Sequence, residues 1–495
     1  MSSFLGRTCE LGELKRIADS AGFRFVVISG RRRVGKTALV DHLIDGMPAV
    51  YFCASRTTAR GNLAALGRQI EREKIRLTTG RPLSESPAIT EDDYPDFAHA
   101  FEAVAELGRE RRLVFVLDEF PDLLESCREV GPLLAQMIDG QFAETQVMLV
   151  VCGSNLPDMH ALTEPNGPLK NLDDVKGNVP KVVREATRIE LSPLNFPDAA
   201  KLIRESSVGR RPTPETLVQY YGCLGGVPYY LASIDPYRSF ANNVKMLFLD
   251  AGSALFEEPD DLLAREIRDP ATYRALLEAL GTGAARLSEV AAYAGMETGN
   301  TSLFLKNLIA IGLVAKDEPA IHDAPHRTEY RITDALFRFW FRFVSPNVSI
   351  IEAGRGDEVY RRMTGELDAY LQEVFRGICV QWVESHRDRL PIACTEIGRW
   401  WGIDALTHQE SRVDILAYED AEGDAGLPKL LCGACIWTPG PLGPEAVDAL
   451  VEQCETFGLS EKHYLLFSRG GFTSTCRTRA REQGDVRLVA LDEML

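Results

Sequence analysis

The segment 30–37, GRRRVGKT, has the residue types and the spacing needed to bind phosphate groups. Gly30 and Gly35 allow the backbone to curl so that its N–H groups face phosphate oxygens, and the N-terminus of a following helix adds a favourable dipole. Lys36 would then reach the β- and γ-phosphates of a nucleotide, and Thr37 would ligate Mg²⁺. A chance match in a loop is the alternative, but an apolar run precedes the segment and helical spacing follows it, which favours the phosphate loop.

An acidic pair ends a second apolar run, VFVLDEF. Its four apolar residues predict a buried strand that presents Asp118 and Glu119 at its end. Asp118 would hold Mg²⁺ through water, and Glu119 would orient and deprotonate an attacking water molecule. Such a pair by itself is more often a solvated turn, but together with the phosphate loop it indicates a hydrolytic site.

The hydrophobic pattern of the sequence predicts the strands and helices that hold these residues in place. Runs rich in Val, Leu and Ile alternate with segments of helical spacing, which indicates a parallel sheet covered by helices on both faces. A helical region and then the order helix, helix, helix and short β-hairpin predict a lid and a winged helix, followed by a linker at 345–358 and a mixed α/β region. The five predicted strands are 23–30, 47–55, 112–120, 145–155 and 186–194.

The segments FLGRTCELGEL, GRRRVGKT, VLDEF, VVCGSN and GGVPYYL, in this order, resemble the archaeal-type ATPase family, which lies in the AAA+/STAND region of the P-loop proteins. The resemblance continues through YRITDALFRFWFRFV and covers nearly the whole chain. It implies an α/β fold with a P-loop ATPase core (1–196), a helical lid (197–262), a winged helix (263–345) and a C-terminal restriction-endonuclease-like domain (355–495) of the PD-(D/E)XK type. It also implies ATP with Mg²⁺ as the ligands. The preference for ATP depends on the resemblance, since a P-loop alone does not distinguish adenine from guanine.

The resemblance implies further contacts with the nucleotide. Leu5, Gly6 and Arg7 would pack near the adenine. Ser154 and Asn155, at the end of the fourth predicted strand, would contact the γ-phosphate or the attacking water. A simple turn from strand to loop is the alternative for these last two residues.

Other candidates come from the lid and the loops. Pro228 would close over the base, and a bare turn is its alternative. Arg184 is a candidate arginine finger, but the segment 167–187 is longer and looser than in relatives, so a surface arginine is the alternative. The remaining predicted nucleotide contacts belong to the phosphate loop and the start of its helix, and they are Arg31, Arg32, Arg33, Val34 and Ala38. Contact with a neighbouring domain, or simple solvation, is the alternative for the three arginines.

The C-terminal domain lacks most of the residues that its resemblance to nucleases would require. Such domains hold Mg²⁺ with an acid on one strand and a Glu-x-Lys on the next, and Asp414 supplies the first acid here. Relatives read roughly GECKW where this chain reads GACIW, so Ala434 replaces the glutamate and Ile436 the lysine. A helix glutamate of the relatives is replaced by Arg376. One carboxylate is a poor site for an ion that prefers six oxygen ligands, so we predict a domain that no longer cuts nucleic acid.

Other residues of this region offer no strong metal site either. Glu373 or Glu410 could substitute for the missing acids, which is the less favoured alternative. Cys432 and Cys435 form a C-x-x-C, but no second pair of ligands appears at zinc-like spacing. Since residues three apart on a strand point to opposite faces, we expect buried structural cysteines.

Composition limits the partners. The 495 residues carry a net charge of −17, and residues 355–495 contain 15 basic and 24 acidic residues. The predicted winged helix, residues 263–345, contains ten basic and ten acidic residues. DNA binding usually needs a basic balance, so DNA stays an alternative, and we expect ATP and ADP plus an unknown protein partner or self-association. No apolar run is long enough for a membrane helix, the N-terminus lacks a signal pattern, and the 11 cysteines are odd in number, so we predict a cytoplasmic protein.

The sequence thus predicts a P-loop ATPase whose hydrolysis moves the lid and the winged helix and thereby changes what the C-terminal domain binds. A nucleotide-gated regulatory or DNA-binding switch with negligible turnover is the first alternative. An ATP-dependent DNA-processing nuclease is the second. Glu119 favours turnover over the switch, and the missing nuclease residues disfavour the second alternative.

Overall fold

The structure is a computed structural model that describes residues 5–81, 87, 93–164, 166–170, 179–207, 211–267, 269–320, 328–394, 396–404, 407–419, 429–458 and 460–495. The chain divides into two compact units, one ending at Pro193 and the other running from Leu194 to Leu495. The boundary lies close to residue 196, where we expect the ATPase core to end. Within the described residues, no helix combines the length and the apolar character needed to cross a membrane.

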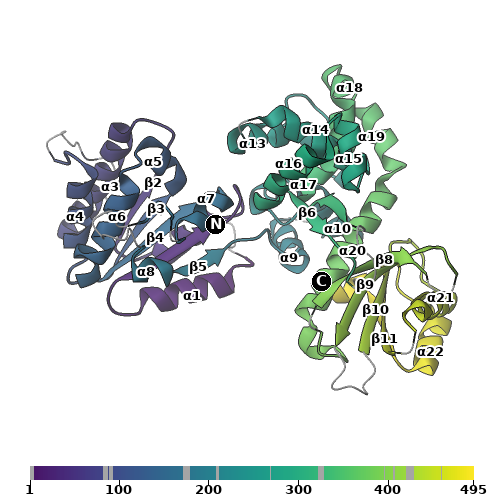
Figure 1. Ribbon diagram of the computed structural model, residues 1–495. Helices are drawn as coiled ribbons and strands as arrows, with labels where there is room; N and C mark the ends of the chain where they lie inside the picture. Colours follow the sequence, from purple (N-terminus) through teal and green to yellow (C-terminus); the bar gives the residue numbers. More distant parts are fainter. Residues whose placement is uncertain are drawn as a thin grey trace. The chain divides into compact units, whose positions relative to one another are not determined.

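A parallel sheet forms the centre of the N-terminal unit (Figure 1). Its order is β2-β3-β4-β1-β5, and every neighbouring pair is parallel. The strand that precedes the phosphate loop is therefore separated from the strand that carries the acids by one inserted strand. This arrangement confirms the predicted parallel sheet. The strands are β1 (Arg24–Ser29), β2 (Ala49–Cys53), β3 (Leu113–Asp118), β4 (Val147–Gly153) and β5 (Thr187–Glu190).

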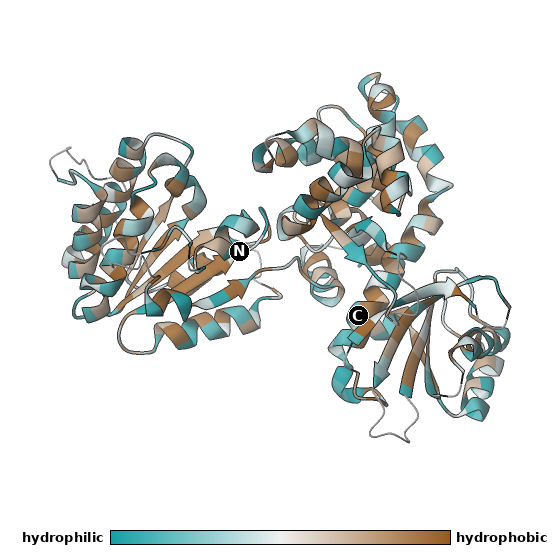
Figure 2. Ribbon diagram, viewed as in Figure 1, coloured by the Kyte–Doolittle hydropathy of each residue, from teal (hydrophilic) through white to brown (hydrophobic). Residues whose placement is uncertain are grey.

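The strands of this sheet are predominantly hydrophobic, as their colour in Figure 2 shows. Their apolar residues divide between two cores, so helices cover both faces of the sheet. Alternate residues of β3 divide between two cores: Val116 packs with α1 and α2, and Phe115 packs with α3 to α6. The helices are α1 (Thr8–Ala18), α2 (Lys36–Ile44), α3 (Ala59–Thr79), α4 (Phe97–Leu107), α5 (Phe120–Ser126), α6 (Val130–Asp139), α7 (Leu156–Ala161) and α8 (Lys181–Arg184).

The second unit begins with a helical region and a winged helix, in the predicted order. The helical region holds α9 (Phe196–Ser206), α10 (Pro214–Leu224), α11 (Pro228–Leu231), α12 (Phe240–Phe248) and α13 (Glu258–Glu266). The winged helix holds α14 (Pro270–Gly281), α15 (Leu287–Ala294), α16 (Thr298–Ala310), the antiparallel hairpin β6 (Val314–Asp317) and β7 (Glu329–Ile332), and α17 (Ala335–Phe339). A π-helical turn, Trp340–Val344, extends α17.

The segment 345–358, predicted as a linker, is helical instead. It contains α18 (Val348–Glu352) and the start of α19 (Gly356–Thr364). Ile351 and Val359 are almost completely buried in the same core as the winged helix. The polar and glycine residues suggested a loop, but apolar residues at helical spacing pack against the lid and the winged helix and override them.

The C-terminal region is a mixed sheet of order β12-β11-β10-β9-β8, which confirms the predicted mixed α/β architecture. β9 is antiparallel to β8 and β10, whereas β10, β11 and β12 are parallel. Residues of α20 pack on one face of the sheet and residues of α21 and α22 on the other. The elements are α20 (Leu367–Ser385), β8 (Glu396–Ile403), β9 (Glu410–Glu419), β10 (Lys429–Ile436), α21 (Glu445–Gln453), β11 (Glu461–Ser468), α22 (Ser474–Gln483) and β12 (Val486–Ala490).

One hydrophobic core runs through the whole second unit. It includes Phe196 in the lid, Leu305 in the winged helix, Phe375 on α20 and Ile415 on β9. We predict the lid, the winged helix and the C-terminal domain as separate domains, and this shared core joins them into one unit.

Candidate nucleotide site

The phosphate loop connects the end of β1 at Ser29 to the start of α2 at Lys36. Gly35 adopts a positive φ of 104°, a conformation that costs a side-chain-bearing residue considerable strain. A Cβ at Gly30 would come within 2.7 Å of the Leu191 carbonyl oxygen, so only glycine fits this close approach. The two glycines that the motif requires are thus explained by the geometry of the loop.

Lys36 lies under the loop and is only 6% exposed. Its Nζ donates hydrogen bonds to the carbonyl oxygens of Gly30 at 2.7 Å and Arg31 at 3.2 Å. Burial lowers the pKa of the ammonium group, whereas the nearby carboxylates of Glu119 and Asp118 oppose that shift. The loop therefore holds a buried cation at the place where the motif predicts the terminal phosphates.

The predicted metal-holding residues lie together. Asp118, 3% exposed, accepts a hydrogen bond on Oδ2 from Thr37 Oγ1 at 3.1 Å. The same oxygen accepts a hydrogen bond from Tyr51 Oη at 2.6 Å, and Oδ1 accepts the Glu119 N–H at 3.0 Å. Thr37 itself is exposed, so its hydroxyl is open to solvent at the mouth of the loop.

These groups fit a magnesium ion bound with a nucleotide. Mg²⁺ usually takes one or two carboxylates, substrate phosphates and several waters rather than a cage of protein ligands. Thr37 would supply a hydroxyl ligand and Asp118 a carboxylate that binds the ion's water molecules. Within the described ranges, no group of three or more His, Cys, Asp or Glu residues could hold a metal by itself.

Glu119 is held apart from the metal-holding pair. Its backbone has a φ of +50°, a left-handed conformation that is uncommon for a residue other than glycine. Its Oε2 accepts hydrogen bonds from Ser154 Oγ at 2.9 Å and from the Ser154 backbone N–H at 3.2 Å. Ser154 follows β4, which is the neighbour of β3 in the sheet. The carboxylate of Glu119 therefore binds Ser154, whereas that of Asp118 binds Thr37.

The two predicted sensor residues differ in what they contact. Ser154 is buried and binds Glu119. The side-chain oxygen of Asn155 instead accepts the Asp158 N–H at 3.3 Å and caps the N-terminus of α7. The structure thus brings Ser154 to the predicted catalytic acid, and gives Asn155 a local role in starting a helix.

The N-terminal segment reaches the phosphate loop through Arg7. Its guanidinium donates to the carbonyl oxygens of Val34, at 3.3 Å, and Ser192, and it also pairs with Glu10 at 3.1 Å. These contacts fasten the loop to the chain that leaves β5. Leu5 and Gly6 precede Arg7 and are partly buried, so the segment predicted to pack near the adenine adjoins the loop.

The remaining predicted residues are not all gathered at the loop. Arg184 is exposed at the end of the short helix α8, and much of the segment before it, residues 171–178, lies outside the described residues. Pro228 begins α11 in the second unit. The loop residues Arg31, Arg32 and Arg33 are partly buried, Val34 is buried and Ala38 is exposed.

One residue of the site escapes sequence reasoning. Tyr51 lies in the middle of β2. In the sequence, an aromatic residue at this position indicates only a strand. No motif marks a tyrosine there as a partner of Asp118, 67 residues later in the chain. The contact arises because β2 and β3 are adjacent and place both side chains on the face of α2.

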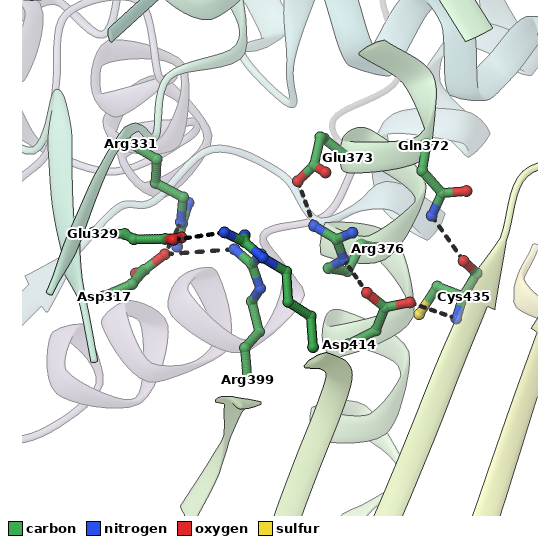
Figure 3. A network of polar contacts seen from close by, with 10 residues as sticks. Asp317, Glu329, Arg331, Gln372, Glu373, Arg376, Arg399, Asp414 and Cys435 are labelled. Carbon is green, nitrogen blue, oxygen red and sulfur yellow. Dashed lines mark hydrogen bonds and ion pairs between the residues drawn. The ribbon is translucent and has the colours of Figure 1, made fainter. Parts of the chain in front are cut away.

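In the C-terminal domain, Asp414 is paired with an arginine (Figure 3). Its Oδ1 accepts a hydrogen bond from Arg376 Nε at 2.6 Å, and its Oδ2 accepts the Cys435 N–H at 2.9 Å. Arg376 also pairs with Glu373. The positive charge beside Asp414 thus comes from Arg376, at the position where we expect a helix glutamate in nuclease-like relatives.

Ala434 and Ile436, where we expect nuclease-like relatives to carry Glu-x-Lys, are not part of the ion pair between Arg376 and Asp414. Ala434 and Ile436 pack, partly buried, in the core shared with α21 and α22. Cys435 and Trp437 belong to the opposite core, on the side of α20. Cys432 also lies opposite to Cys435, and both are buried free thiols, in agreement with the structural role that we expect for them.

The hairpin β6–β7 contacts the C-terminal sheet, and we call this the wing contact (Figure 3). The Ala320 N–H donates to the Arg399 carbonyl oxygen at 2.7 Å. Arg412 pairs with Glu329 at 3.0 Å, and Arg399 lies 4.0 Å from Asp317. Acidic side chains of the hairpin therefore face arginines of the C-terminal domain.

The five-stranded parallel sheet, the phosphate loop and the acidic pair define a P-loop nucleotide-binding protein of the ATPase type. Residues 4–234 match the model of a family described as an ATPase domain predominantly from Archaea. Residues 340–437 match a family described as archaeal and bacterial proteins of unknown function.

Similarity to individual proteins extends over most of the chain. An uncharacterized protein of Methanocaldococcus jannaschii is 26% identical over 428 residues, which are 85% of this chain and 86% of that protein. A Walker-type ATPase of Pyrococcus abyssi matches with a TM-score of 0.53 and 18% identity, over 68% of this chain and 96% of that one, and so shares the fold. Cdc6p of Pyrobaculum aerophilum matches with a TM-score of only 0.33 and 13% identity, over 72% of this chain and 94% of that one.

Proposed function

We propose that the N-terminal unit binds Mg·ATP and hydrolyses it by in-line attack of water. The observation that carries this proposal is that two adjacent acids have different side-chain partners. Asp118 lies 3.1 Å from the hydroxyl of Thr37, while the carboxylate of Glu119 accepts hydrogen bonds from Ser154. One carboxylate is thus available for the metal and the other for a water molecule.

Each residue has a distinct part in the proposed reaction. Lys36 stabilises the negative charge on the terminal phosphates, for which its contacts with the Gly30 and Arg31 carbonyls are exchanged. Glu119 takes the proton of the attacking water as the bond between the γ-phosphorus and the bridging oxygen breaks and ADP leaves. Bound Mg²⁺ neutralises the charge of the phosphates.

Ser154 controls when Glu119 can act. Two hydrogen bonds from Ser154 occupy Oε2 of Glu119, so this oxygen is engaged and not directed toward a water molecule. We propose that nucleotide binding weakens these bonds, so that Glu119 turns toward the water. Ser154 therefore acts as a sensor of the γ-phosphate through its contact with the catalytic acid.

We propose that the nucleotide state is transmitted to the C-terminal domain by movement of the lid and the winged helix. The shared hydrophobic core and the wing contact support this, because any displacement of the winged helix would carry the C-terminal domain with it. The role of this domain is then to bind a partner, and the exposed Tyr293 and Leu303 on α15 and α16 favour a protein partner over DNA.

We also propose that the C-terminal domain is a pseudo-nuclease. In support of this, Asp414 is neutralised by Arg376, and Ala434 and Ile436 provide no ligand. A cation beside Asp414 would have to displace a guanidinium group that already holds both Asp414 and Glu373. The domain would thus keep the fold for binding without the chemistry.

A nucleotide-gated switch with negligible turnover is the second candidate. The two hydrogen bonds that Ser154 donates to Glu119 favour it, because they hold the proposed base. Steady-state phosphate release by the wild type and by Glu119→Gln distinguishes the two. We expect the wild type to release phosphate continuously, and we expect Glu119→Gln to bind ATP with similar affinity but release at least about 100-fold less, the usual contribution of a general base. Equally slow release by both proteins would support the switch.

A further inference from the structure

We infer that Tyr51 is a positioning residue that holds the carboxylate of Asp118 and so sets the Mg²⁺ requirement of the nucleotide site. This inference rests on the proposed function, since it concerns the same metal. No motif marks Tyr51. Its contact with Asp118 is nevertheless the shortest of the three hydrogen bonds that this carboxylate accepts, at 2.6 Å against 3.0 and 3.1 Å.

The sheet places the tyrosine hydroxyl beside the metal-holding pair. In the register of β2 and β3, Tyr51 lies opposite Val116 and Cys53 lies opposite Asp118. Tyr51 and Val116 pack in the core under α2, the helix whose first turn carries Thr37. The side chains of Tyr51, Thr37 and Asp118 therefore converge from three different elements.

The hydroxyl of Tyr51 is a dependable donor. Its oxygen lies 2.6 Å from Oδ2 of Asp118, and the phenol is the donor because a carboxylate oxygen accepts. A hydrogen bond from a neutral donor to a carboxylate is stronger than one between neutral groups. Tyr51 thus contributes a fixed, uncharged contact on Oδ2 of Asp118.

The other donor to Oδ2 has a competing task. Thr37 donates its hydroxyl to Asp118, but in the proposed site the oxygen of this hydroxyl is a metal ligand. The orientation of Asp118 would then depend on Tyr51 and on the Glu119 N–H, which binds the other oxygen. Without Tyr51, the carboxylate would be free to rotate away from the ion's water molecules.

Another tyrosine of the same unit provides a matched control. Tyr94 is 6% exposed, and its hydroxyl donates to the Glu71 carboxylate at 2.6 Å, the same distance as between Tyr51 and Asp118. Glu71 lies on α3 and pairs with Lys74, with no contact to the phosphate loop among the described residues. Tyr94→Phe therefore removes an equivalent hydroxyl without touching the metal-holding pair.

The test measures Mg²⁺-dependent ATP binding in a Glu119→Gln background, where hydrolysis does not interfere. Calorimetric titrations with ATP at increasing Mg²⁺ give the concentration of Mg²⁺ at which the increase in ATP affinity is half complete. We expect Tyr51→Phe to raise that concentration about tenfold, the effect of losing one hydrogen bond to a charged group. ATP affinity in EDTA should stay unchanged, and Tyr94→Phe should behave like the parent in both titrations.

The outcomes separate this inference from the proposed function. An unchanged Mg²⁺ requirement in Tyr51→Phe would overturn the inference, and so would a parallel loss of affinity with and without Mg²⁺, which would indicate a purely structural tyrosine. Absence of phosphate release by the wild type would instead contradict the hydrolysis proposal, while the binding titrations would still decide the role of Tyr51.

Discussion

Arg376 on α20 and Asp414 on β9 form an ion pair, with Arg376 Nε 2.6 Å from Asp414 Oδ1. Both side chains are largely buried, at 14% and 20% exposure. A single buried carboxylate without a metal would be costly, and the guanidinium satisfies it. The pair therefore gives a physical reason why the fold tolerates a largely buried carboxylate at this position.

The first prediction concerns DNA. Incubation of the purified protein with plasmid and with linear DNA, in the presence of Mg²⁺ or Mn²⁺ and with ATP, should leave both substrates intact on a gel. The reason is that Asp414 and the neighbouring Glu373 are both paired with Arg376. Cleavage that disappears in Asp414→Ala would restore the nuclease alternative.

The second prediction concerns the stability of the C-terminal domain. Arg376→Ala leaves Asp414 without its cation, so the free energy of unfolding should fall by about 2 kcal/mol, less than for a fully buried pair because both groups retain some solvent contact. Urea denaturation followed by the fluorescence of the domain's tryptophans measures this change. The matched control is Arg361→Ala, which removes an exposed arginine on α19 and should change the free energy by less than about 0.5 kcal/mol.

The third prediction concerns the phosphate loop. Lys36→Ala removes the buried cation that lies under the loop, so tight binding of ATP and of ADP should be lost in calorimetric titrations. The control is Lys74→Ala, which removes a lysine paired with Glu71 on α3 and should leave nucleotide affinity unchanged. Unchanged ATP affinity in Lys36→Ala would refute the assignment of the site.

The fourth prediction concerns the wing contact. Reversing one charge, in Arg412→Glu or in Glu329→Arg, places like charges 3.0 Å apart and should speed backbone hydrogen exchange in β6, β7 and β8. The double variant restores opposite charges and should recover most of the protection. Because Arg412 is 55% exposed, the coupling energy should be below about 1 kcal/mol and should weaken with added salt.

Recovery in the double variant distinguishes an ion pair across the wing contact from two unrelated surface charges. If each single variant exchanges like the wild type, the Arg412–Glu329 pair does not hold the hairpin, and the Ala320–Arg399 backbone bond, the Arg399–Asp317 pair and the apolar contacts do. The charges of the wing would then stay available to another partner.

The sequence by itself determined the phosphate loop, the strands and the acidic pair. Gly30, Gly35, Lys36 and Thr37 act through a short stretch of backbone, so their spacing is enough to define the geometry. The strands of the parallel sheet are buried on both faces, and continuous apolar runs reveal such strands. The order of helices and hairpin in the winged helix follows from local periodicity in the same way.

Only the tertiary structure decided which of these residues meet. Tyr51 contacts Asp118 across 67 residues, and Arg376 contacts Asp414 across 38, and no local pattern encodes either contact. Packing also decided that residues 345–358 are helical, because their apolar side chains find a core far away in the sequence. Local propensity is a property of neighbouring residues, whereas polar pairing depends on how separate strands and helices are brought together, and that is why the site's partners could not be predicted from the sequence.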